Sequence, residues 1–223
     1  MLTTTKAPRV RAALAALVGA ALLGGCAVTG GSPGARHEAA AQGAAQGAAD
    51  EWMPAAPASA AAWLADVGHI YDTAVGGGSA EAWLRQRMAH RRPGERLAVV
   101  LGIDDVMLQT HFAGLNALVP RSVRFVRTAH ALGYSVFYVT GRSYGTGLGD
   151  VESTIERANV PANAFYGRPL GAKDDESAKA ECRAAIEHQG YTLAMSVAAS
   201  EVSFDGAPAA EKEVRLPDFA VTG

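Results

Sequence analysis

The sequence is short of basic runs, long apolar stretches and cysteine. Acidic residues outnumber basic ones by 22 to 20, and without a basic run nothing predicts a nucleic-acid-binding surface. The N-terminal apolar run, Ala12–Leu23, is too short to span a bilayer. Cysteine occurs only as Cys26 and Cys182, so a modification of either residue excludes an intramolecular disulfide. Because Cys182 lies in a helical pattern, we expect a small buried apolar side chain there rather than a reactive thiol.

The beginning of the chain has the pattern of a bacterial secretory signal. Three basic residues precede the apolar run, as they do in signal peptides. The run ends in Leu23-Gly24-Gly25-Cys26, which resembles the lipobox, where the cysteine becomes the lipidated N-terminus after cleavage. We therefore expect a signal peptide over 1–25 and a membrane anchor at Cys26, with the protein in the cell envelope facing the periplasm or the exterior. An ordinary signal peptide, or a short core helix with a chance cysteine, is the alternative.

Residues 26–59 are predicted to be a tether, and residues 60–223 a single domain. The tether consists mainly of Ala, Gly, Gln, Ser and Pro and has too few large apolar residues to offset the entropy of ordering it. Removing the signal segment takes away three basic residues and no acid. The mature chain then has 17 basic against 22 acidic residues, a formal charge of −5.

Uninterrupted apolar runs predict strands that are buried on both faces of a parallel sheet. They are Leu97–Leu101, Tyr134–Val139 and Tyr191–Val197, with a short strand at Ala164–Tyr166. Helical patterns cover 60–74, a segment capped by Ser79, 121–132, 150–158 and 178–189, and 171–177 is predicted as a loop. This alternation predicts an α/β fold, with a three-layer, Rossmann-like parallel sheet, flanking helices and a helical N-terminal lead-in.

Polar side chains follow the first two long strands, at the edge of an open α/β sheet where ligands bind. Asp104 and Asp105 come directly after the first strand, and Thr140-Gly141-Arg142 directly after the second. A hydroxyl beside a glycine offers hydrogen-bond donors without bulk, which suits a phosphoryl oxygen.

The segment Gly102-Ile103-Asp104-Asp105-Val106 resembles the first motif of the haloacid dehalogenase superfamily. In the secreted acid phosphatases of that superfamily the motif is Asp-Ile-Asp-Asp-Thr; the first Asp attacks phosphorus, the second is the general acid/base, and magnesium bridges the site. The resemblance implies that Asp104 occupies the acid/base position. The nucleophile position is occupied by Gly102, which cannot attack.

The resemblance extends from about residue 60 to residue 219 and assigns further positions. It implies that Thr140 donates to the phosphate and that Arg142 is the arginine common in this branch. Lys179 matches the lysine that neutralises phosphate and aspartate charge from the first turn of a helix, with Lys173 as the weaker candidate. The closing segment Val214–Pro217 resembles the final edge strand of the family.

The magnesium ligands of the family are missing. In the family the corresponding strand ends in Gly-Asp with a second Asp four residues later, and the matching acid positions here are Ala199 and Ser203. Glu201 and Asp205 have the same spacing, but they match only if the strand extends by two residues, which moves the acids by roughly 6–7 Å. We therefore expect no metal site and no cofactor.

These residues leave three hypotheses for the function. The first, which we favour, is a lipid-anchored pseudophosphatase of this fold with a structural, adaptor or ligand-binding role. The second is a weak or altered acid phosphatase that uses Asp104 as a base for water. The third is a module that binds a phosphate-bearing small molecule through Thr140, Arg142 and Lys179 without turnover. The sequence names no protein partner.

Overall fold

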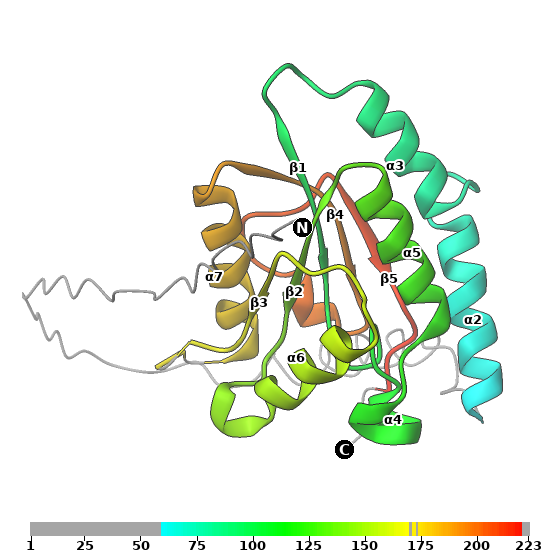
Figure 1. Ribbon diagram of the computed structural model, residues 1–223, viewed down its shortest axis with the longest axis vertical. Coiled ribbons are helices and arrows are strands. Elements are labelled where there is room, and N and C mark those ends of the chain that lie inside the picture. The colour runs from blue at the N-terminus through cyan, green and yellow to red at the C-terminus, as the bar shows by residue number, and fades with distance from the viewer. Residues whose placement is uncertain (1–58, 170, 173, 220–223) are drawn as a thin grey trace, which may run out of the picture. The chain divides into compact units, whose positions relative to one another are not determined.

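The structure, a computed structural model, describes residues 59–169, 171–172 and 174–219. Its centre is a five-stranded, fully parallel sheet in the order β3-β2-β1-β4-β5 (Figure 1). The strands are β1 (Arg96–Leu101), β2 (Ser135–Val139), β3 (Ala164–Tyr166), β4 (Tyr191–Ala198) and β5 (Lys212–Arg215). The predicted α/β, Rossmann-like fold is confirmed, with every predicted strand in place to within one residue or two.

Six helices and three short 3₁₀ turns connect and cover the strands within these described ranges. The helices are α2 (Ala60–Thr73), α3 (Ala80–Ala89), α4 (Thr110–Ala113), α5 (Pro120–Ala131), α6 (Leu148–Arg157) and α7 (Asp175–His188). The turns are η1 (Gly114–Asn116), η2 (Tyr144–Thr146) and η3 (Glu201–Ser203). Helices α2 and α3 form the predicted N-terminal lead-in and begin after serine caps, because the side chains of Ser59 and Ser79 accept hydrogen bonds from backbone amides.

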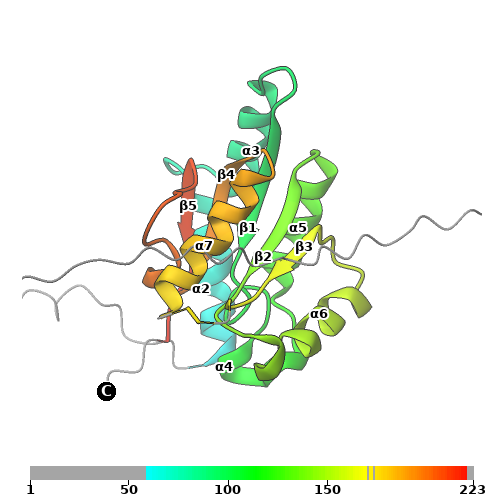
Figure 2. The same ribbon diagram turned by 90° about the vertical axis from the view of Figure 1, so that its left-hand side faces the viewer.

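The helices form one layer on each side of the sheet. Alternate residues of the central strands, such as Val99 and Tyr138, point into a core shared with α2, α3, α5 and α6. Their neighbours, such as Val100 and Phe137, pack instead against Cys182 and other residues near α7. Figure 1 shows these two layers on opposite sides of the sheet, and Figure 2 is viewed from the α7 side.

The two outer strands of the sheet are short. Strand β3 is three residues long, and in β5 only Val214 is buried, while the charged Lys212, Glu213 and Arg215 are exposed.

Cys182 is buried as predicted. Burial raises the pKa of its thiol to about 11, so at neutral pH the side chain is a protonated, unreactive thiol.

A partly buried ion cluster that the sequence analysis did not predict joins the lead-in helices to α5. The Arg121 guanidinium donates to Glu81 of α3 and, at 2.7 Å, to Asp72 of α2. It also lies over the ring of Tyr71, with 4.7 Å from Cζ to the ring centroid. These contacts fix the three helices against one another on the side of the sheet away from α7.

One prediction about the chain after β3 is wrong. Helix α7 begins at Asp175 rather than at 178, because the Asp174 side chain accepts a hydrogen bond from the Ser177 amide and caps the helix. Lys179 therefore lies beyond the first turn. Strand β4 ends at Ala198, one residue past its predicted end. The disfavoured alignment with Glu201 and Asp205, which required an extension by two residues, is therefore not supported.

Several predictions lie outside the described residues: the signal peptide, the lipidated Cys26, the tether before Ser59, and Lys173. Across the described ranges, no helix is both long and apolar enough to cross a membrane.

Candidate functional site

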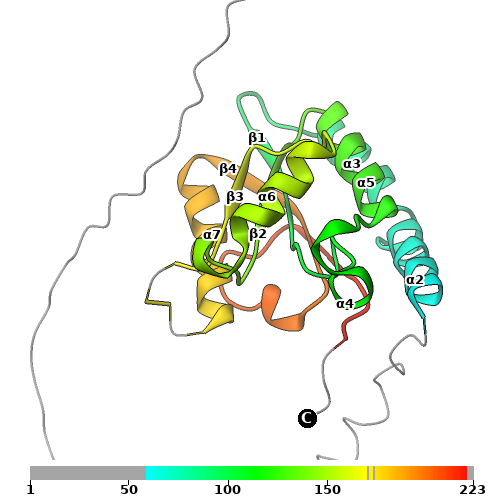
Figure 3. The same cartoon turned by 60° about the horizontal axis from the view of Figure 1, so that its bottom comes forward.

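The carboxyl edge of the sheet brings the predicted site residues together. Leu101 of β1 pairs with Tyr138 of β2 and with Val197 of β4, so the residues after these three strands emerge side by side. Gly102, Thr140 and Ala199 lie at this edge, as expected. After β1 the chain adds β2 and β3 on one side, and it then adds β4 and β5 on the other side of β1. In an open parallel sheet, the crevice that binds ligands lies where the strand order reverses in this way, here between β1 and β4. Figure 3 views the molecule with this end forward, where α4, α6 and the loop after β4 surround it.

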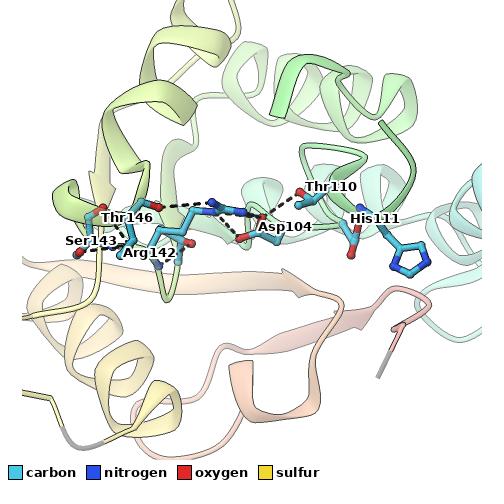
Figure 4. A network of polar contacts seen from close by, with 8 residues as sticks. Asp104, Thr110, His111, Arg142, Ser143 and Thr146 are labelled. Atoms are coloured by element: carbon cyan, nitrogen blue, oxygen red, sulfur yellow. Dashed lines mark hydrogen bonds and ion pairs between the residues drawn. The ribbon is translucent and has the colours of Figure 1, made fainter. Parts of the chain in front are cut away.

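Asp104 is bound to Arg142 by a multiple ion pair. Arg142 Nη2 lies 2.6 Å from Asp104 Oδ1, and Nε lies 3.1 and 3.0 Å from the two carboxylate oxygens. The Thr110 hydroxyl donates a further hydrogen bond of 2.9 Å to Oδ1 (Figure 4). Hydrogen bonding to Asp104 raises the pKa of Arg142. The two charges therefore offset each other, while the Asp104 side chain stays 38% exposed.

The turn after Arg142 holds this arginine in place. Ser143 and Thr146 form a reciprocal capping arrangement around η2, visible beside Arg142 in Figure 4. Gly167, after β3, passes so close that a Cβ at this position would lie 2.6 Å from the Arg142 carbonyl oxygen. Only glycine allows this approach, and the loop after β3 is thereby packed against the backbone of Arg142.

Asp105 has a structural role at the start of α4. Its backbone is in the left-handed region, with φ at 52°, and its carboxylate accepts a 2.9 Å hydrogen bond from the His111 amide. Burial raises the pKa of Asp105. The carboxylate therefore binds a backbone amide in the first turn of the short helix.

The phosphate-binding position predicted around Thr140 is enclosed by the protein itself. Thr140 is 3% exposed, and its hydroxyl oxygen accepts a hydrogen bond from the Arg142 amide. A Cβ on Gly141 would lie 2.9 Å from a carboxylate oxygen of Asp175, so the carboxylate rests directly against the Gly141 backbone. Asp175 is in turn paired with Arg168 at 3.0 Å. A carboxylate of the chain thus occupies the approach that a phosphoryl oxygen would need.

Lys179 reaches the crevice but contacts a hydroxyl instead of a carboxylate. Its Nζ donates a 2.8 Å hydrogen bond to Ser203 Oγ. Burial lowers the pKa of Lys179, and the negative charges of Asp175, Asp104 and Asp218 oppose this shift. Lys179 and Ser203 line a cavity of about 10 Å³ together with Gly102. That is the space of about one water molecule, too small for a phosphate group.

Arg183 is a residue at this edge that the sequence analysis missed. It is 2% exposed and donates to the carbonyl oxygens of Ser203 at 2.5 Å, Gly206 at 3.1 Å and Pro208 at 2.8 Å, and also to that of Asp205. Arg183 thus secures the whole loop after β4. The available signal was its position four residues after Lys179, which places both side chains on one helix face.

The residues present do not fit a magnesium ion. Within the part of the chain that the structure describes, no group of three or more His, Cys, Asp or Glu side chains could hold one ion. Gly102, Ala199 and Ser203 supply no carboxylate, and the oxygens of Asp104 are engaged by Arg142 and Thr110. A hard divalent cation needs several such oxygens at once.

Neither a protein-family model nor a curated protein matches this chain in sequence. The family assignment therefore stays a prediction that rests on the motifs.

Proposed function

We propose that this protein is a lipid-anchored pseudophosphatase of the haloacid dehalogenase superfamily, whose domain has a structural or adaptor role in the cell envelope. The observation that carries the proposal is the pairing of Asp104, the general acid/base position, with Arg142 through three hydrogen bonds. To take a proton from water, this carboxylate would have to give up hydrogen bonds from the guanidinium group.

The chemistry of phosphoryl transfer supports the same conclusion. The reaction requires an in-line nucleophile and a cation that offsets the charge on phosphate and carboxylate together. Gly102 supplies no nucleophile, and the adjoining cavity of about 10 Å³ has no room for a phosphate. The alternative of a weak phosphatase that uses Asp104 therefore lacks a nucleophile, a metal and a free base.

The contacts also favour an adaptor role over phosphate binding at this edge. Arg142 is paired with Asp104 and Arg168 with Asp175, so a phosphate dianion would have to displace a carboxylate from each arginine. Lys179 donates to Ser203, and the cavity that both residues line has room for about one water molecule.

The test is hydrolysis of p-nitrophenyl phosphate by the purified full chain across acidic and neutral pH, with magnesium and with a chelator. We expect no turnover above that of an Asp104→Asn control, and no heat of binding for phosphate or magnesium in calorimetry. Chelator-sensitive turnover by the unmodified protein would overturn the pseudoenzyme proposal. Phosphate binding without turnover would instead favour the binding module.

A further inference from the structure

A wide groove lies between α3 and α5, on the side of the sheet away from α7. Its volume is about 650 Å³, and it is lined by Arg85 of α3, by α5 residues that include Val123, Arg124 and Arg127, and by Leu132 just after α5. The three arginines are exposed, while Val123 and Leu132 are half-buried between them. The groove therefore combines three guanidinium groups with an apolar floor.

The arginines of this groove are not neutralised by the protein. The groove-lining residues that the structure describes include no acid. Among described residues, the guanidinium groups of Arg85 and Arg124 have no hydrogen-bond or ion-pair partner, and that of Arg127 contacts only the Ala158 carbonyl, at 3.3 Å. Several other arginines of the domain are paired with acids, as Arg121 is with Glu81 and Arg142 with Asp104. A chain with a net charge of −2 thus gathers unpaired positive charge in one groove.

The chemistry of the groove suits phosphate groups arranged on a surface. Guanidinium groups bind phosphate oxygens in pairs of parallel hydrogen bonds, and they keep their charge at every physiological pH. The apolar floor at Val123 and Leu132 adds contact area for the glycerol and upper acyl region of a lipid. Each arginine near an anionic membrane contributes its own electrostatic attraction, so the contributions of three arginines on one face add up.

We propose that this groove docks the domain onto anionic phospholipid headgroups. The proposal rests on the membrane-anchor part of the proposed function, which supplies the membrane as the occupant. Helix α2, which follows the predicted tether, packs directly against both α3 and α5. Residues 27–58 separate Cys26 from the first described residue and can span at most roughly 110 Å. The anchor thus leaves the groove within reach of the bilayer and keeps headgroups at high local concentration.

The experiment uses the full chain with Cys26→Ser, which carries no acyl group, in sedimentation with phospholipid vesicles. The test variant is Arg85→Gln/Arg124→Gln/Arg127→Gln. The matched control, Arg91→Gln/Arg157→Gln/Lys212→Gln, removes the same charge from three separate exposed positions. Glutamine preserves helix propensity, and circular dichroism checks that both variants fold. Any contribution of the N-terminal apolar run is common to all three proteins.

We expect the parent to bind vesicles containing about one-third phosphatidylglycerol roughly tenfold more tightly than pure phosphatidylcholine vesicles, and to lose this preference at high salt. The test variant should lose the preference and the control should keep it. Equal binding of the parent to both vesicles, or equal loss in both variants, overturns the proposal. Displacement by free glycerol phosphate at the same phosphate concentration would assign the groove to a soluble anion and likewise overturn it. Because no acyl chain and no hydrolysis is involved, these outcomes are independent of the anchor and activity tests.

Discussion

At the scale of single residues, Gly102 has little freedom to change. A Cβ at this position would lie 3.1 Å from Val106 Cγ2, and Val106 is fully buried behind it. At the position where the family has its nucleophile, the surrounding residues thus leave little space for a side chain. Similarly, Asp175 lies against Gly141 where a larger residue would collide.

We expect Gly102→Asp to lower the free energy of unfolding by about 1–3 kcal/mol, because it crowds Val106 and adds a carboxylate near Asp104. Urea denaturation measures the loss, and Gly102→Ala separates the steric part from the charge. Magnesium binding should require Gly102→Asp, Ala199→Asp and Ser203→Asp together. A Gly102→Asp protein as stable as the parent would contradict this prediction and indicate that Lys179 accepts the new carboxylate.

At the scale of elements, Arg183 joins α7 to the loop after β4. We expect Arg183→Leu to destabilise the protein by about 2–4 kcal/mol, because it removes the buried guanidinium group and leaves several part-buried carbonyl oxygens without a donor. Arg183→Lys should recover only part of this loss, since an ammonium group cannot reach the same set of acceptors. Chemical denaturation gives the magnitude, and faster hydrogen exchange confined to residues 203–208 and α7 would locate it. Exchange unchanged in that loop would refute the assignment.

Glu95, in the segment between α3 and β1, should make the stability of the protein depend on pH in the acidic range. The pKa of Glu95 is lowered from 4.5 to about 2, first by its hydrogen bonds from Arg87 and then by one from the Arg92 amide. A group whose pKa is lower in the folded state stabilises the protein above its unfolded pKa. This stabilisation is lost as the pH falls from about 4.5 toward 2.

Glu95→Gln should therefore flatten the fall in melting temperature over this pH range while lowering it at neutral pH. Glu187→Gln, at an exposed position on α7, is the control. Parallel pH profiles for the parent and Glu95→Gln would refute the role of the Arg87 pair.

The elements that the sequence predicts well are those with a local signal. The strands are continuous β-forming runs, and the cap at Ser79 is visible in the residues themselves, whereas the cap at Ser59 falls in the predicted tether. The start of α7 was missed because its cap, Asp174, follows a loop-like composition. The buried roles of Arg121 and Arg183 were missed because an arginine is buried only where distant segments supply its acceptors. Likewise, motif matching placed Arg142 at the site but did not indicate that Asp104 would bind it.

At the scale of the whole molecule, the predicted anchor would determine where the protein is found. We expect Cys26→Ser to release the protein from membranes or to block its maturation, because the acylated residue is lost. Cell fractionation and the mass of the mature chain are the measurements, with Cys182→Ser as the control. A Cys26→Ser protein that stays with membranes at its normal mature mass after a high-salt wash, which removes binding through the arginine groove, would refute the lipobox interpretation.

The short, charged outer strands of the sheet have a consequence for proteins confined to two dimensions. Anchored chains diffuse in one plane and meet other copies far more often than dissolved chains do. Each meeting exposes β3 or β5 to another backbone, and a long, apolar edge would add strands from copy to copy. Strand β3 offers three residues, and β5 presents Lys212, Glu213 and Arg215 to solvent. A dense layer of this protein would therefore stay a layer of separate molecules.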